Sequence, residues 1–145
     1  SPDTHMNFDL GLAEERSQKN PVFYVQYANA RINSIFTHAR VKAIPVDDFS
    51  YTDLNALSLP DELRIIKKLL TYPMVFEGAV NAHEPHRITF YLQELAGIFH
   101  PYYNRCKVVT EDPALTAARL ALCEAVRVVL KDGLELLGIT APEKM

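Results

Sequence analysis

Two tyrosines and one arginine recur at steps of three and four residues within a strongly helical stretch. Tyr24, Tyr27 and Arg31 would therefore lie along one side of a helix. Unpaired nucleic-acid bases stack on phenol rings, and a guanidinium forks onto a phosphate or lies flat on a base. The same spacing is typical of tyrosines that pack at a core edge with their hydroxyls in water. Spacing alone leaves both interpretations open.

A second cluster of aromatic and basic residues occurs near position 100. It consists of Tyr102, Tyr103 and Arg105. Tyr102 belongs to the apolar seam of a predicted helix, so Tyr103 is the ring that is freer to face outward. The last residue, Met145, is typical of a disordered chain end when the pattern is considered by itself.

The histidines indicate a metal site only weakly. His83 and His86 flank Glu84-Pro85, whereas zinc-binding helices place two histidines four residues apart on a continuous helix. Because Pro85 opens a predicted helix, we interpret this segment as a solvated helix start. A small metal-dependent helical enzyme is a third hypothesis that depends on these two residues alone, and a metal assay would test it. The five glycines are scattered, and the sequence contains neither a phosphate loop nor a nucleophile elbow. We therefore predict no catalytic residue and no metal ligand.

Length and charge limit the class of protein. The chain has 145 residues, which suits a single domain over residues 1–145. The hydrophobic fraction of 48% and the charged fraction of 23% are ordinary for a globular protein. The formal net charge of −3 does not itself indicate a nucleic-acid partner. Any affinity for RNA should therefore depend on a few well-placed basic residues.

Cysteine usage and hydropathy favour a reducing cytoplasm. Cys106 and Cys123 are too few and too far apart to indicate a disulfide framework, and both fall in helical patterns as small apolar residues. The sequence shows no signal peptide and no uninterrupted apolar run of membrane length. We therefore expect a cytoplasmic protein without a membrane partner. The start at Ser1, rather than at methionine, suggests a fragment of a longer chain.

Helical periodicity recurs from end to end, and strand signals are almost absent. Asn20-Pro21, Pro60, Pro85 and Asp112-Pro113 are helix starts, and Gly138 is a helix end. We expect one helix over residues 8–17 and a second over 20–43. A third should begin at 60 and break at 73, and a further helix should continue to 82. The last two should cover 85–106, with a kink at Pro101, and 112–138. The last helix is apolar on more than one side and should be central. The fold class is all-α, a bundle of about five or six helices.

The expected inward seams follow from this periodicity. In the helix over 20–43 the seam is Val25, Ala28, Ile32, Ile35 and Ala39. In the helix over 85–106 it is Ile88, Leu92, Leu95, Phe99, Tyr102 and Cys106. In the last helix it is Leu115, Leu122, Val126, Leu130, Leu134 and Leu137. In the helix that begins at Pro60, we expect inward Leu63, Ile66 and Leu70, with outward Lys67 and Lys68.

The first long helix resembles the signature run of a known family, the anticodon-binding domain of arginyl-tRNA synthetases. That run is Asn20-Pro21-Val22-Phe23-Tyr24-Val25-Gln26-Tyr27-Ala28-Asn29-Ala30-Arg31-Ile32. Further matches follow in the family's order, at residues 1–5 and 8–10, 72–73, 84–87, 99–100 with 103–104, 116–122 and 136–139 to 143–145. The resemblance covers essentially the whole chain, and it is more specific than any single motif.

The resemblance implies a fold and a function. The family, of the class I aminoacyl-tRNA synthetase type, attaches arginine to its tRNA with ATP, and this bundle holds the anticodon loop. It implies tRNA-binding roles for Tyr24, Tyr27, Arg31, Tyr103 and Met145. The implied partners are the anticodon loop of tRNA(Arg) and the catalytic domain of the same polypeptide. This piece itself needs no cofactor, whereas the full-length parent would use ATP with Mg.

Several departures from the family pattern accompany the resemblance. Asn29 stands where the family often has His, and Pro101 stands where a charged residue is usual. The Asp-Ala-Leu-Arg run that names the domain is absent, as are the ATP-binding signatures of the catalytic domain, so this piece alone should not activate arginine.

The alternative function is a free-standing helical module that binds a protein partner. Titration with an anticodon stem-loop at low and high salt would discriminate the two functions.

Overall fold

The computed structural model describes residues 9–17 and 19–145, and the regular elements of these residues are all helices. They are α1 (Leu10–Glu14), α2 (Pro21–Val41), a short 3₁₀ helix η1 (Leu54–Ala56), α3 (Pro60–Leu70), α4 (Tyr72–Ala82), α5 (His86–Arg105) and α6 (Pro113–Leu136). The all-α prediction is confirmed. Residues 1–8, which include part of the predicted first helix and of the family resemblance, lie outside the described residues. In the described part of the chain, no helix is both long and apolar enough to cross a membrane.

Polar side chains cap two of the predicted helix starts, those of α2 and α6. The Asn20 carboxamide oxygen accepts hydrogen bonds from the amides of Val22 (3.0 Å) and Phe23 (3.3 Å) at the start of α2. At the start of α6, the Asp112 carboxylate accepts from the amides of Ala114 (2.9 Å) and Leu115 (3.3 Å). In both helices a proline occupies the first turn, where its missing N–H costs no hydrogen bond.

Three helices, α2, α4 and α6, are followed by a residue in the left-handed backbone conformation. After α6, Gly138 has a φ of 72°, and the amide of Ile139 donates to the Leu134 carbonyl at 2.8 Å. After α2, Ala43 adopts a φ of 58°, and the amide of Ile44 donates to the Ala39 carbonyl at 3.0 Å. The 6→1 bond is the mark of the Schellman motif, which favours glycine at the left-handed position. Alanine at the same position is strained.

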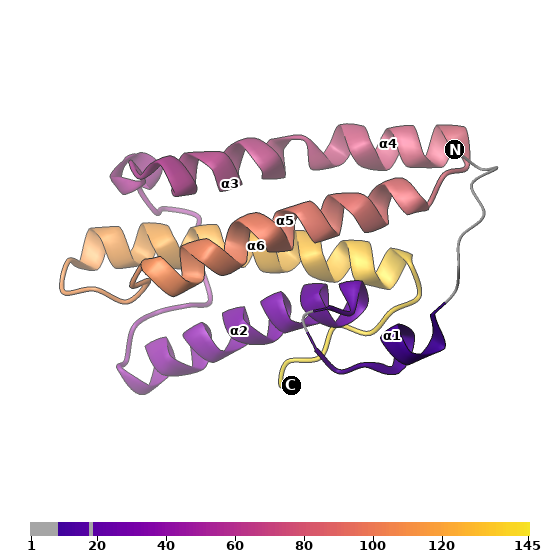
Figure 1. The fold of residues 1–145 in the computed structure, drawn as a ribbon. Coiled ribbons are helices and arrows are strands. Elements are labelled where there is room, and N and C mark those ends of the chain that lie inside the picture. The colour runs from indigo at the N-terminus through magenta and orange to yellow at the C-terminus, as the bar shows by residue number, and fades with distance from the viewer. Residues whose placement is uncertain (1–8, 18) are drawn as a thin grey trace.

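The helices stack in three layers (Figure 1). α3 and α4 follow one another along one side, α5 and α6 occupy the middle, and α2 covers the other side. α6 contacts α2, α3, α5 and η1, so the prediction of a central last helix is confirmed, and α5 shares the centre because it contacts α2, α3, α4 and α6. Gly133 allows α5 and α6 to approach closely, since a Cβ there would lie 2.7 Å from a Leu92 methyl group. α5 continues through Pro101 to Arg105.

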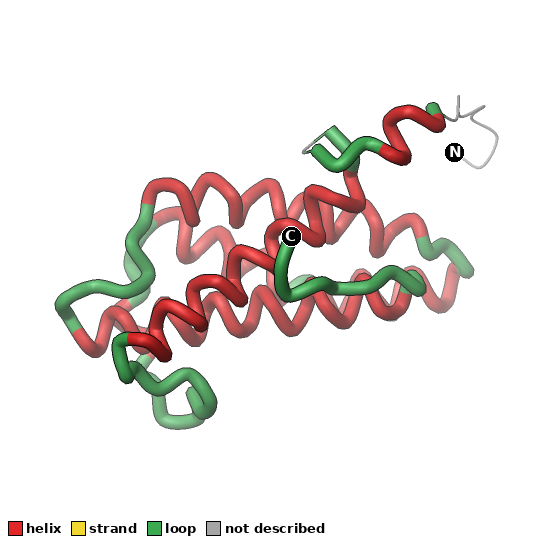
Figure 2. Tube along the Cα trace, turned by 90° about the horizontal axis from the view of Figure 1, so that it is seen from below, coloured by secondary structure: helices red, strands yellow, loops and turns green. Residues whose placement is uncertain are grey.

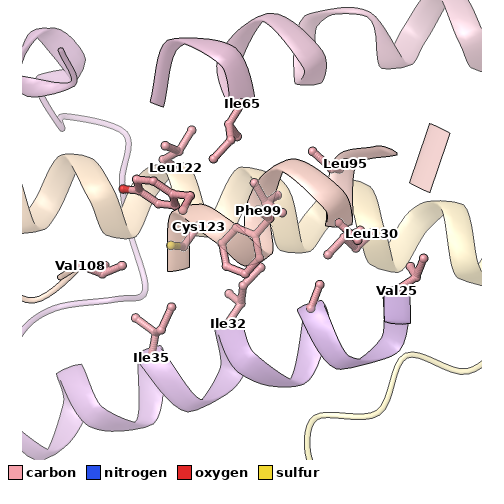
Figure 3. Packing of buried hydrophobic residues seen from close by; sticks show 14 of the residues in the cluster. Val25, Ile32, Ile35, Ile65, Leu95, Phe99, Val108, Leu122, Cys123 and Leu130 are labelled. Atoms are coloured by element: carbon pink, nitrogen blue, oxygen red, sulfur yellow. The ribbon is translucent and has the colours of Figure 1, made fainter. Parts of the chain in front are cut away.

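The core lies between α2, α5 and α6 (Figure 3). The whole predicted seam of α2 is buried, as are five of the six predicted seam residues of α5; Cys106 is half-buried. In α6, Leu122, Val126, Leu130 and Leu134 are buried, whereas Leu115 and Leu137 are half-buried. Cys123 is also buried, and burial raises the pKa of its thiol to about 12. Both cysteines are free.

The predicted inward face of α3 was wrong for Leu63 and Leu70, whereas Ile66 is half-buried and packs against the core. Leu63 and Leu70 are 45% and 72% exposed, whereas Glu62 and Ile65 are fully buried. The prediction failed because an inward carboxylate, invisible to a hydrophobic pattern, rotates the helix. Lys68 is likewise not outward, since it is half-buried, pairs with Glu94 and lies 4.7 Å from the centre of the Tyr91 ring.

Glu62 and Arg119 form a buried ion pair that connects α3, α6 and the end of α5. Arg119 Nε donates to Glu62 Oε1 at 2.7 Å, and Arg119 Nη1 donates to the Lys107 carbonyl at 2.7 Å. The second carboxylate oxygen accepts from the amides of Ser58 and Leu59, both at 3.0 Å. The Tyr102 hydroxyl donates to Oε1 at 3.3 Å. Hydrogen bonds thus compensate both charges for the loss of water.

Replacing one residue of the buried ion pair should lower the free energy of unfolding. We expect Arg119→Met to lower the free energy of unfolding by about 3–5 kcal/mol, because the Glu62 carboxylate stays buried without its cation. Urea denaturation followed by circular dichroism measures the change. The control is Arg105→Met, which breaks an exposed pair with Asp61 and should cost at most about 1 kcal/mol. Equal losses in the two variants would contradict the structural role of the buried pair.

The left-handed helix ends predict two opposite effects. Ala43→Gly should raise the free energy of unfolding by about 1 kcal/mol, because glycine adopts a positive φ without steric cost. Gly138→Ala should lower it by a similar amount for the same reason. Thermal denaturation of the two variants beside the parent chain measures both effects. A loss of stability in Ala43→Gly would show that the strain is absent.

Candidate nucleic-acid interface

The Arg31 guanidinium lies between two tyrosine rings. Its central carbon is 4.5 Å from the centre of the Tyr27 ring and 4.7 Å from that of Tyr103. Arg31 Nη1 also donates to Asn104 Oδ1 at 3.1 Å, so two rings and one hydrogen bond hold the guanidinium. Cation–π contacts of this kind stabilise a fixed orientation. Packing of α2 against α5 therefore brings Tyr103, from the second predicted cluster, to Tyr27 and Arg31 of the first.

A groove of about 800 Å³ opens beside this stack. It is lined by Tyr27, Arg31 and Tyr103 together with Met145 at the end of the chain. The structure thus places four of the five predicted tRNA-binding residues around one open groove. They come from α2, from α5 and from the C-terminal segment after α6.

Tyr24 does not line this groove. Its ring centre lies 4.4 Å from that of His100, and its side chain is half-buried against the core. His100 is buried, lies 5.9 Å from the Tyr27 ring and has its Nε2 atom 3.1 Å from the Tyr24 carbonyl. Burial lowers the pKa of His100, so the imidazole is neutral near pH 7. Tyr24 and His100 therefore support the wall of the groove from behind.

Two amide side chains of α2 hold the C-terminal segment. Gln26 Nε2 donates to the Thr140 carbonyl, and Asn29 Nδ2 donates to the Pro142 carbonyl, both at 2.9 Å. Figure 2 shows this segment running back from the end of α6 across the bundle. These contacts bring Met145 to the groove. Neither amide was predicted from the sequence to be functional. Their spacing of three residues, beside Tyr24 and Tyr27 on one helix, was the sequence feature that could have indicated them.

Asn29 is only 2% exposed. Its Oδ1 atom accepts no hydrogen bond from the described residues, so the side chain acts as a donor alone. In the sequence, Asn29 stands out only because it differs from the residue usual in the family. In the structure, its side chain is one of the groups that bind the C-terminal segment.

The charges around the groove are nearly balanced. Its lining includes the basic residues Arg31, Arg40, Arg127 and Lys144 and the acidic residues Asp47, Glu124 and Glu143. Arg127 donates two hydrogen bonds of 2.7 Å to Glu124, which raises the pKa of its guanidinium. Arg40 pairs with Asp47 at 3.4 Å. A groove of aromatic walls and compensated charges suits neutral base faces better than phosphates.

The two histidines of the metal hypothesis lie at the turn between α4 and α5. His83 ends α4 with a φ of 56°, and His86 is the first residue of α5, with its ring 6.0 Å from that of Phe90. Both side chains are exposed. Over residues 9–17 and 19–145, no three His, Cys, Asp or Glu side chains are grouped so that they could hold a metal ion.

Comparison with known proteins shows which proteins this chain is similar to. The arginine–tRNA ligase of Geotalea daltonii is 52% identical over 144 residues, and that of Geobacter metallireducens is 50% identical over 144 residues. Each match covers 99% of this chain but 26% of the relative, so the chain spans about a quarter of the length of these curated relatives. The solved Thermus thermophilus arginyl-tRNA synthetase superposes with a TM-score of 0.81 at 31% identity, over 99% of this chain and 24% of that one.

A family model gives the family assignment. The DALR anticodon binding domain matches residues 25–145, which include most of α2, all of α3 to α6 and the whole C-terminal segment. The helical bundle is shared with the solved synthetase. This chain therefore belongs to the DALR anticodon binding domain family.

Proposed function

We propose that this chain binds the anticodon loop of tRNA(Arg) as the anticodon-binding domain of a longer arginine–tRNA ligase. The observation that carries this proposal is the Arg31 guanidinium held between Tyr27 and Tyr103 beside an open groove. Its membership in the DALR family and the names of its relatives support the same partner. The 145 residues form one domain of that enzyme.

The remaining properties of the parent follow from the same proposal. The parent ligase attaches arginine to tRNA with ATP and Mg in a catalytic domain of the same polypeptide, in the cytoplasm. This domain contributes recognition of the tRNA, needs no cofactor and is catalytically inactive alone.

Base stacking explains how the groove would act. Each base that stacks on an aromatic or guanidinium face contributes roughly 1–3 kcal/mol, without requiring a particular base. Tyr27 and Tyr103 are half-buried and Arg31 is already oriented between them, so little conformational freedom is lost on binding. Met145 adds a soft, polarisable thioether to the same surface. The groove would therefore accept unpaired loop bases.

A protein-binding module was the alternative from the sequence. The groove favours RNA because it combines aromatic rings with charged side chains of both signs and is not broadly apolar. Titration of the chain with a tRNA(Arg) anticodon stem-loop discriminates between the two. Binding that weakens as salt increases supports RNA, whereas no binding at any salt concentration supports a protein partner.

Tyr27→Ala tests the stacking surface in the complete enzyme. We expect the KM for tRNA to rise about 5- to 150-fold, which corresponds to the loss of one stacked base. The KM values for arginine and ATP at saturating tRNA should not change. Tyr27→Phe keeps the ring and should behave as the parent, and Tyr51→Ala removes a fully exposed ring elsewhere. An unchanged KM for tRNA in Tyr27→Ala would refute the role of this ring.

Gln26→Ala tests whether the C-terminal segment positions Met145. Loss of the bond to Thr140 should increase hydrogen exchange over residues 139–145 and weaken stem-loop binding. In combination with Met145→Ala, the two losses should not add, because both act on the same contact. Asn81→Ala is the matched control, since it removes an exposed amide side chain of α4 outside the groove. Fully additive losses would show that Gln26 acts independently of Met145.

A further inference from the structure

A second groove, of about 530 Å³, lies against the other side of Tyr103. Ser34 and Tyr103 line both grooves, so the two are adjacent and the Tyr103 ring separates them. The charged or titratable side chains that line the second groove are His38, Lys42 and Lys107, together with the Cys106 thiol, whose pKa is raised by burial. Its lining contains no Asp or Glu, in contrast to the balanced charges of the first groove.

A row of basic side chains extends from the aromatic stack along one face of α2 to its C-cap residue. Arg31, His38 and Lys42 are separated by seven and four residues, so they lie along one face of the helix. From Arg31 to Lys42 the row extends about 16 Å along the helix axis. It therefore begins at the stacking surface and continues into the second groove.

Lys107 faces this row from a fixed backbone. Arg119 Nη1 donates to the Lys107 carbonyl at 2.7 Å, and the neighbouring Val108 side chain is buried. The Thr110 amide donates to the Thr116 hydroxyl at 2.9 Å, which holds the rest of the loop to α6. The Lys107 side chain is exposed, so a charge lies on a rigid loop at the groove's edge.

The lysine charges are uncompensated within the described part of the chain. Lys42 and Lys107 form no ion pair there, whereas the nearby Arg40 and Arg105 pair with Asp47 and Asp61. Uncompensated positive charge attracts phosphate and releases the counterions of a nucleic acid on binding.

We propose that the second groove holds backbone phosphates of the RNA strand whose bases stack in the first groove. This inference rests on the proposed function. Bases in the first groove leave their phosphates outside it, because that groove is aromatic and its charges are balanced. The adjoining surface across Tyr103 offers positive charges alone. Lys42 and Lys107 are thus backbone-binding residues, and they fix the direction in which the strand leaves the aromatic stack.

The salt dependence of binding tests this inference. The probe is a synthetic tRNA(Arg) anticodon stem-loop, titrated with the 145-residue chain at several salt concentrations. The double variant Lys42→Ala/Lys107→Ala should bind more weakly at low salt, and its slope of log K against log salt should be shallower by about 1.4 to 1.8. Both side chains are exposed, and Lys107 holds the loop through its carbonyl, so the fold should persist.

Two controls separate local contacts from net charge and from stacking. Lys67→Ala/Lys131→Ala removes the same charge from exposed positions outside both grooves and should leave the slope near that of the parent chain. Tyr27→Ala should weaken binding at every salt concentration with the slope unchanged. Normal binding by the parent chain with equal slopes in the two double-lysine variants would overturn the phosphate site alone. No binding by the parent chain at any salt concentration would overturn both the site and the proposed function.

Discussion

The position of the groove beside Arg31 depends on one buried ion pair. Glu62 of α3 has no solvent exposure, and Arg119 of α6 joins its carboxylate to the Lys107 carbonyl beyond the end of α5. Taking two charges out of water is expensive, so the pair persists only because backbone amides, a tyrosine hydroxyl and a carbonyl complete its hydrogen bonds. The geometry that satisfies these groups also sets where the last turn of α5 and its following loop lie.

That last turn carries the group that separates the two grooves. Tyr103 meets Arg31 of α2 on one side and faces the basic second groove on the other. The chain has a net charge of −3, yet this local arrangement supplies aromatic faces and uncompensated lysines within a short distance. In the proposed function, base contact and phosphate contact are divided between neighbouring surfaces, and neither needs a basic protein overall.

The C-terminal segment depends on contacts across more than one hundred residues of sequence. Gln26 and Asn29 reach the Thr140 and Pro142 carbonyls. Without such bonds, a chain end of this kind loses little by moving freely. The amide donors replace water on these carbonyls and bring Met145 to the aromatic groove. The edge of the first groove is therefore formed by α2 and the C-terminal segment together.

Helix starts, helix ends and most inward seams were predictable because each is encoded within a few neighbouring residues. Asn20-Pro21, Asp112-Pro113 and Gly138 act on the backbone beside them, and the apolar spacing of α2 reports its own buried face. The face of α3 was not predictable, because the inward turn of Glu62 needs Arg119 from 57 residues away. The same holds for the site. The sequence determined which rings and charges a helix face offers, but only tertiary packing decided that Tyr24 lies behind the groove wall while Tyr103 and Met145 join Tyr27 and Arg31.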